Sequence, residues 1–176
     1  MKKGTMFVIP GEWLAADEAA GIDLTVNDQA LRFDAPPRRT LADALRDNGF
    51  TGVRVGCEQG SCGTCTVLVD DQPVRSCLVL AVQAEDSSVE TVEGLAGEAE
   101  LHALQRAFHE HGALQCGFCT PGFLMLAAGL LRGDPKASPE RVREVLAANL
   151  CRCTGGLPIL RAVLAAQREL LEEETR

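Results

Sequence analysis

The stretch GCEQGSCGTC, residues 56–65, holds three of the eight cysteines of this 176-residue chain, together with three glycines. Four residues separate Cys57 from Cys62, two separate Cys62 from Cys65, and Cys77 follows after eleven more. Glycine lacks a Cβ, so it permits positive φ and lets backbone N–H groups approach a bound group closely. The stretch therefore predicts a loop that wraps around a bound group, with Cys77 closing the site from a neighbouring strand.

This cysteine spacing is that of plant-type [2Fe–2S] ferredoxins, C-x4-C-x2-C with a distant fourth cysteine. Two irons bridged by two sulfides need two thiolates each, so the loop must reach the cluster from several sides. A thioredoxin-like pair at Cys62 and Cys65 should open a helix, yet the residues after Cys65 read as a strand. A four-cysteine zinc site is chemically possible, but such sites usually present two tight knuckles. The first cysteine set thus favours a [2Fe–2S] cluster.

The residues on both sides of this loop predict an α+β domain over residues 21–94. Alternating apolar residues from Ile22 to Phe33, interrupted at 27–28, predict a β-hairpin. Thr40 is expected to cap a short helix that ends at residues 48–49. Strands are predicted over residues 66–69 and 74–82. Residues 1–20 form an N-terminal extension without a recognisable motif.

The second half, residues 98–173, shows helical periodicity and predicts a four-helix bundle. The predicted helices cover residues 99–114 and 121–131, a segment opened by Ser138 and Pro139, and a last segment from about Pro158. The segment 121–131 is apolar on every side, which predicts a helix buried in the middle of the bundle. Residues 94–97 are the expected linker.

The remaining four cysteines lie in this helical half, at Cys116, Cys119, Cys151 and Cys153. Each pair adjoins the start of a predicted helix, so the two pairs can converge on one metal centre. The positive end of a helix dipole would also favour thiolates there. Spacing alone leaves both iron–sulfur and zinc open for this set.

The histidines offer no alternative ligand set. His102, His109 and His111 lie on a polar helix and none is spaced with a cysteine as a ligand pair, so a Rieske centre is not expected. All three are expected to be solvated.

Composition and charge exclude several function classes. The net charge is −8 and no large basic patch is present, so nucleic acid is not an expected partner. The longest apolar run, residues 123–131, is about half of the ~20 residues that a membrane span needs. No secretion signal is recognised at the N-terminus, so a cytoplasmic protein with reduced thiols is expected.

Three motifs together resemble the iron–sulfur subunit of the molybdenum hydroxylases, the family of xanthine dehydrogenase and aldehyde oxidase. They are GCEQGSCGTC at residues 56–65, QCGFCTPG at residues 115–122 and CRCTG at residues 151–155, in that order. The resemblance covers roughly residues 22–171. One departure is Gly156, where the family often has an aromatic residue.

This resemblance implies a β-grasp ferredoxin domain followed by a helical domain, each holding one [2Fe–2S] cluster. Cys57, Cys62, Cys65 and Cys77 would hold the cluster distal to the molybdenum, and the other four cysteines the proximal one. Gln115 and Cys153 would contact the pterin of a molybdopterin-type molybdenum cofactor on a large partner subunit. A further partner subunit carrying FAD is also implied.

The expected function is therefore electron transfer from a partner's molybdenum cofactor to a flavin subunit or another acceptor. The chain has no dinucleotide fingerprint, no P-loop and no room for a molybdopterin-binding domain, so no catalytic residue of its own is expected. A xanthine- or purine-type holoenzyme is favoured within the family, with carbon monoxide, aldehyde or N-heterocycle dehydrogenases as alternatives. The alternatives of another class are a free-standing ferredoxin-like carrier and a zinc-stabilised binding module.

Overall fold

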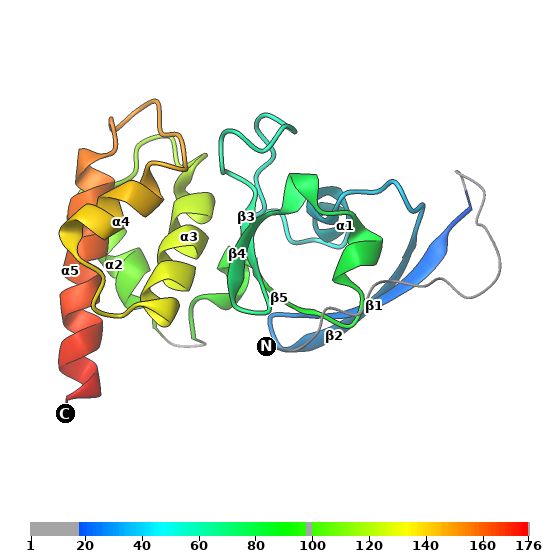
Figure 1. Ribbon diagram of the computed structural model, residues 1–176, viewed down its shortest axis with the longest axis horizontal. Coiled ribbons are helices and arrows are strands. Elements are labelled where there is room, and N and C mark those ends of the chain that lie inside the picture. Colours follow the sequence, from blue (N-terminus) through cyan, green and yellow to red (C-terminus); the bar gives the residue numbers. More distant parts are fainter. Residues whose placement is uncertain (1–17, 98–99, 176) are drawn as a thin grey trace.

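The computed structural model describes residues 18–97 and 100–175, which form a five-stranded sheet beside a group of four α-helices (Figure 1). The expected N-terminal extension lies almost wholly outside these residues. Two separate hydrophobic cores are present, one built from residues between 22 and 89 and one from residues between 95 and 166.

The predicted hairpin is confirmed as β1 (Ala20–Val26) paired antiparallel with β2 (Gln29–Ala35). The two turn residues, Asn27 and Asp28, have φ of 49° and 63°. These values suit a two-residue turn of the kind whose twist matches that of the flanking strands, and Asn and Asp tolerate them well. The turn fixes the register that points Ile22, Leu24 and Val26 into the core.

The sheet has the order β2-β1-β5-β3-β4, with β3 (Thr66–Val69), β4 (Gln72–Arg75) and β5 (Ser88–Glu90). The central pair β1–β5 is parallel and the other pairs are antiparallel. Helix α1 (Leu41–Asp47) begins at its predicted cap, where Thr40 Oγ1 accepts from Asp43 N at 3.1 Å. Its buried face joins the sheet core, giving the expected β-grasp arrangement.

The strand predicted over residues 74–82 is wrong beyond residue 75. The chain turns there into two short 3₁₀ helices, η1 (Ser76–Leu78) and η2 (Ala81–Ala84). Ser76 causes this turn, because its N–H and its hydroxyl both donate to the carbonyl of Cys65, at 3.3 and 2.6 Å. Cys77 therefore lies on a turn that bends back toward Cys65. β5 was not predicted, because its three residues are too few to show an alternation of apolar and polar side chains.

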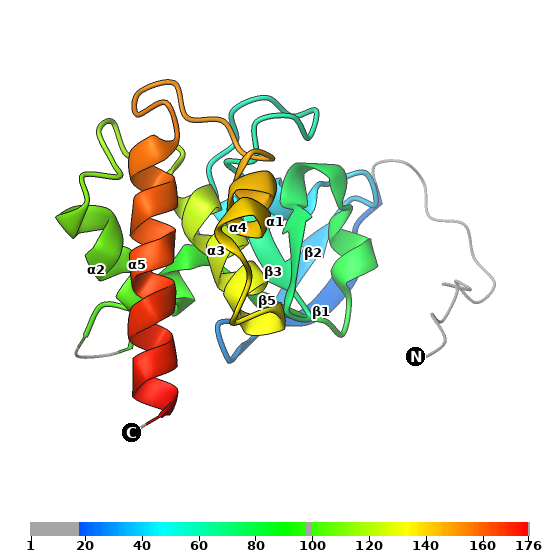
Figure 2. The ribbon, with the colours of Figure 1, turned by 60° about the vertical axis from the view of Figure 1, so that its left-hand side comes forward.

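The helical part contains α2 (Ala103–Glu110), α3 (Thr120–Gly133), α4 (Pro139–Leu146) and α5 (Leu157–Glu174), as four predicted helices (Figure 2). Ser138 caps α4 with Pro139 at its first position, as predicted. α2 is shorter than predicted, because His102 caps it and Gly112, with φ of 59°, follows its end. A third 3₁₀ turn, η3 (Val92–Gly94), precedes the bundle.

Helix α3 lies between the sheet and the other helices (Figure 1), which explains why it is apolar all round. A Cβ added to Gly129 would lie 2.9 Å from Leu68 and 3.1 Å from Pro73, so α3 packs closely on β3 and β4. Its opposite side joins the helical core through Phe123, Leu124 and Ala127. Among the described residues, no helix is long and apolar enough to span a bilayer.

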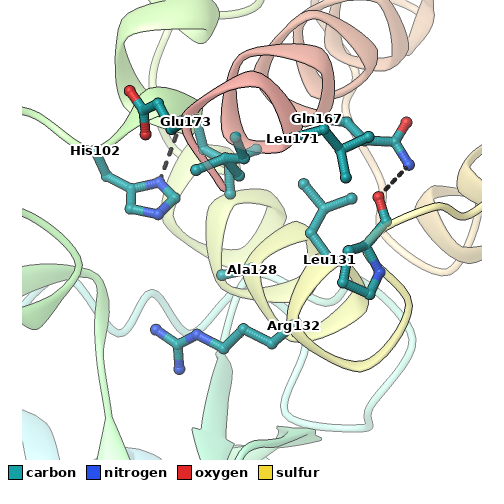
Figure 3. A pocket seen from close by; sticks show the side chains of 10 residues that line it. His102, Ala128, Leu131, Arg132, Gln167, Leu171 and Glu173 are labelled. Atoms are coloured by element: carbon teal, nitrogen blue, oxygen red, sulfur yellow. Dashed lines mark hydrogen bonds between the residues drawn. The ribbon is translucent and has the colours of Figure 1, made fainter. Parts of the chain in front are cut away.

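One histidine differs from expectation. His102 is half-buried, and its Nδ1 accepts from Leu104 N at 3.2 Å as the cap of α2 (Figure 3). It lines a cavity of about 560 Å³ between α2, α3 and α5. Burial lowers the pKa of His102, helped by the nearby Arg132 and Arg106. His109 and His111 are exposed, as expected.

Candidate metal centres

Both cysteine sets lie on loops at one end of the molecule, uppermost in Figures 1 and 2. The first set occupies the loop between α1 and β3, joined by Cys77 on η1. The second set occupies the α2–α3 and α4–α5 connections, with Cys119 directly before α3. All eight cysteines are free thiols.

The four thiols of the first set form two pairs. Cys62 N–H donates to Cys57 Sγ at 3.4 Å and the two side chains are in contact, while Cys65 contacts Cys77. The first pair is partly exposed and the second is buried. The loop reaches this shape through positive φ at Gly60 and Gly63, of 78° and 75°, as predicted.

The third glycine of this loop, Gly56, serves a different purpose, since it is not among the residues with positive φ. A Cβ there would lie 3.2 Å from the Phe118 ring and 3.4 Å from Cys62 Sγ. Gly56 thus makes room for the second cysteine loop to approach the first.

The local environment favours thiolates at the exposed side of the first set. Hydrogen bonds from the backbone N–H groups of Gln59 and Cys62 lower the pKa of Cys57 to about 6. Burial raises the pKa of Cys77 to about 11, with a further contribution from neighbouring Cys65. A cation would have to supply the missing stabilisation at the buried pair, since a bound metal deprotonates its thiol ligands outright.

The second set is also paired. Cys153 Sγ lies 3.5 Å from Cys116 Sγ, and Cys119 contacts Cys151. The Cys116–Cys153 pair is exposed at the surface, whereas the Cys119–Cys151 pair is partly buried. Burial raises the pKa of Cys119 to about 12. Although burial opposes it, the hydroxyl and N–H of Thr154 lower the pKa of Cys151, with Oγ1–Sγ at 3.0 Å.

The pairing fits a two-iron cluster at each site. Among the residues that the structure describes, no three Cys, His, Asp or Glu side chains converge as ligands of a single ion. A [2Fe–2S] cluster instead needs two thiolates on each of two irons, and both cysteine sets present two pairs. A tetrahedral zinc ion, which needs four ligands around one point, fits the arrangement less well.

The two sites are in direct contact through backbone. Leu150 N–H donates to the carbonyl of Cys62 at 2.9 Å, joining the residue before Cys151 to a cysteine of the first set. Gly122, at the start of α3, approaches so closely that a Cβ would lie 2.3 Å from the Gly63 carbonyl oxygen. Arg75 adds a clamp, with Nη2 donating to Ala148 O at 2.8 Å and Nη1 donating to Thr66 Oγ1 at 2.6 Å.

Several of these residues carry no motif of their own. Arg75 reaches Ala148 across 73 residues, and a Cβ on Gly63 would lie 1.9 Å from Asn149 Oδ1, so only the tertiary structure brings Arg75 and Asn149 to the site. Thr154, by contrast, lies in the CRCTG motif and follows Cys151 by three residues, a spacing that suits a local hydroxyl–sulfur contact. Gln115 is exposed beside Cys116, where a partner chain can reach both.

Large apolar side chains are exposed on the loops that carry the exposed cysteine pair. Leu114, Phe118, Leu150 and Leu157 are large, exposed and placed on the same loops or directly after them. Concentrated exposure of this kind marks interaction surfaces. These four residues with Gln115, Cys116 and Cys153 are termed the cysteine face.

Sequence comparison matches both halves of the chain to families of known chemistry. Residues 24–96 match the 2Fe-2S iron-sulfur cluster binding domain, and residues 91–164 match the [2Fe-2S] binding domain.

Several curated relatives cover most of the chain. It is 52% identical to the caffeine dehydrogenase subunit gamma of Pseudomonas sp. (strain CBB1), over 81% of this chain and 87% of that subunit. It is 51% identical to the nicotine 6-hydroxylase small subunit of Paenarthrobacter nicotinovorans, over 85% of this chain and 90% of that subunit. It is 41% identical to the xanthine dehydrogenase iron-sulfur-binding subunit of Escherichia coli O157:H7, over 86% of this chain and 96% of that subunit.

A solved structure agrees with these relatives. The crystal structure of quinoline 2-oxidoreductase from Pseudomonas putida 86 contains a chain with a TM-score of 0.85 and 50% identity. The match covers 89% of this chain and 98% of that one.

Proposed function

Since the chain belongs to the iron–sulfur subunits of the molybdenum hydroxylases, we propose that it relays electrons through two adjacent [2Fe–2S] clusters, from a partner's molybdenum cofactor to a second acceptor. It is the iron–sulfur subunit of a multisubunit oxidoreductase, and substrate oxidation takes place on another chain. The molybdenum cofactor, when bound by the partner, supplies that oxidation chemistry, and the clusters accept one electron at a time. The observation that carries the proposal is the pairing of all eight thiols into two adjoining sets.

We assign the ligands by these pairs. Cys57 and Cys62 would hold one iron of the distal cluster, and Cys65 and Cys77 the other. In the proximal cluster the pairs that would hold the irons are Cys116 with Cys153 and Cys119 with Cys151. The division into a ferredoxin-type domain, residues 21–94, and a helical domain, residues 98–173, follows the two hydrophobic cores, although buried Leu95 already belongs to the helical one.

The cysteine face is the proposed docking surface for the large molybdenum subunit. Gln115 and Cys153 are both exposed on it, so both can approach a pterin held by that subunit. The apolar residues around them supply the buried contact area, as in the cores of other interfaces. A separate FAD subunit is the proposed acceptor, on the side of the distal cluster.

The proposed substrate class is the nitrogen heterocycles, including purines. Relatives at 50% identity or more are named for caffeine, nicotine and quinoline, and a further relative for xanthine. Because the large subunit binds the substrate, these names bear on the complex and not on residues of this chain. We place the complex in the cytoplasm, where eight free thiols remain reduced and available to iron.

The test is substrate-driven reduction of the clusters in the complex. The chain should co-purify with a large molybdenum subunit, and anaerobic addition of a heterocycle such as xanthine or nicotine should bleach the visible absorption of the oxidised clusters. The isolated chain should not respond to the same compounds. A free-standing carrier would instead purify without a stable partner, and bleaching of the isolated chain would overturn the proposal.

A further inference from the structure

A buried amide lies between the two cysteine loops without a hydrogen-bond partner. Asn149 is 6% exposed, and neither its Oδ1 nor its Nδ2 has a partner among the residues that the structure describes. Leaving a buried polar group unpaired is unfavourable, because the group loses its hydrogen bonds to water without replacement. A leucine of similar size would fill the same space without that cost, so the amide calls for a hydrogen-bonding group that the polypeptide does not supply.

The position of the Asn149 amide indicates which hydrogen-bonding group is missing. A Cβ on Gly63 would lie 1.9 Å from Asn149 Oδ1, so the side chain rests directly on the turn between Cys62 and Cys65. The backbone on both sides of Asn149 is fixed, since Ala148 O accepts from Arg75 and Leu150 N–H donates to Cys62 O. The backbone around Asn149 is therefore tied to β4 and to the Cys62 loop, and its carboxamide lies against the Gly63 turn of the first cysteine set.

The [2Fe–2S] cluster proposed for the first cysteine set offers only hydrogen-bond acceptors. Sulfides and thiolate sulfurs accept hydrogen bonds and donate none, and hydrogen bonds to these sulfurs are one of the protein's means of setting a cluster's reduction potential. The amide of Asn149 has two N–H donors that match this need. A donor stabilises the more negative, reduced cluster and so raises its potential.

We propose that Asn149 raises the reduction potential of the distal cluster by donating a side-chain N–H to one of its sulfides, since no cysteine sulfur in the described part of the chain accepts from the amide. This inference rests on the proposed function, because it requires a cluster at the first cysteine set. It gives the helical domain a direct influence on the cluster of the other domain. Electron transfer from the proximal to the distal cluster becomes more favourable as a result.

The test is a redox titration of the two-cluster protein monitored by EPR, comparing wild type with Asn149→Leu and Asn149→Asp. Both variants keep the side-chain size and remove the donor, so the distal midpoint potential should fall in each, and further in Asn149→Asp because of its negative charge. The proximal potential should stay unchanged. Assignment of the two signals comes from Cys77→Ser, which perturbs only the distal set.

A matched control is Gln167→Leu, which removes another buried amide that already has partners. Gln167 Nε2 donates to Pro135 O at 2.9 Å and to Ala137 O at 3.0 Å, in the helical core lined by α5. This variant should lower thermal stability and leave both potentials unchanged. Unchanged potentials in both Asn149 variants, or a shift of the proximal signal alone, would overturn the inference while leaving the relay intact. Absence of both [2Fe–2S] signals in wild type would overturn the proposed function as well.

Discussion

Each cysteine belongs to one thiol pair and to one of the two cysteine sets, so its substitution should affect a single cluster. Cys116 and Cys153 form the exposed pair of the second set, and Cys62, Cys65 and Cys77 lie in the separate first set. Serine at one position of a pair leaves an iron with one good thiolate ligand. The loss should stay local, because the two sets share no cysteine.

Cys153→Ser should therefore lose the proximal cluster and keep the distal one. Iron content should fall from about four to about two per chain, as expected for loss of one [2Fe–2S] centre. Iron analysis and EPR of the reduced protein measure this directly. Two intact clusters with full turnover of the complex would show that the ligand assignment is wrong.

Residue-level sequence patterns predicted that the eight cysteines form two sets of four, and the structure brings the members of each set together. The prediction succeeded because a rare residue type at fixed spacing survives any error in secondary structure. The same patterns did not predict Asn149 or Arg75. Both depend on contacts across more than 70 residues, which local periodicity does not register. Gly156 is explained only by the structure, where its φ of 86° at the start of α5 suits glycine.

At the scale of single elements, the start of α3 holds the two cysteine loops together. Gly122 lies against the Gly63 carbonyl and Thr64, whereas Gly133, at the other end of the helix, has no neighbour within 4 Å of an added Cβ. Substituting each glycine by alanine therefore separates two effects on stability. Both substitutions raise helix propensity, but only the one at Gly122 disturbs close packing.

Gly122→Ala should destabilise the protein by about 1–3 kcal/mol, since the added methyl forces the helix away from the loop. Gly133→Ala should be neutral or stabilising, by up to about 1 kcal/mol. Chemical denaturation of the cluster-loaded protein gives both values. Equal stability of the two variants would contradict the close approach.

The N-terminal cap of α2 should make stability depend on pH. The pKa of His102 is lowered from 6.5, first by burial and then by Arg132 and Arg106, with Glu90 and Glu173 acting in the opposite direction. The unfolded chain then binds a proton more readily than the folded one. The stability contributed by neutral His102 is fully present above about pH 6.5, its pKa in the unfolded chain. It is lost as the pH falls from there through the lower pKa of the folded protein.

His102→Asn keeps a capping side chain but does not titrate, so its stability should fall less than that of wild type between pH 7 and pH 5. His102→Ala should cost about 1 kcal/mol at pH 7 through the lost cap. Thermal unfolding across this pH range measures both effects. An identical pH profile for wild type and His102→Asn would exclude a contribution from this residue.

Element boundaries show where local patterns are sufficient. The caps at Thr40 and Ser138 are local hydrogen bonds, and both helices begin where the sequence predicts. The end of β4 is set by Ser76, whose partner Cys65 lies eleven residues away, so an apolar pattern through residue 82 indicated a strand that does not form.

For the molecule as a whole, the arrangement of the two domains is held by contacts far from the clusters as well. Arg132 on α3 pairs with Glu90 on β5 through two hydrogen bonds, at 2.5 and 2.8 Å, and also reaches Asp71 at 3.3 Å. Together with the Arg75 clamp, these contacts join the sheet to the end of α3 and to the α4–α5 connection.

Leu157→Asp should weaken binding to the molybdenum subunit without loss of iron. Leu157 is 50% exposed on the cysteine face, and aspartate is favourable at the first position of α5. Removing one apolar contact from an interface costs about 1–2 kcal/mol, or about five- to thirtyfold in Kd. Leu101→Asp, at a similarly exposed leucine next to the cap of α2, is the control and should bind normally. Equal affinities would place the docking surface elsewhere.

The central claim, two [2Fe–2S] clusters on one chain, is tested most directly by low-temperature EPR of the anaerobically purified protein before and after dithionite, with iron counted on the same sample. The account predicts two distinct S = 1/2 signals on reduction and about four irons per chain. A single signal with about two irons, or an EPR-silent protein that contains zinc after cluster loss has been excluded, would contradict it.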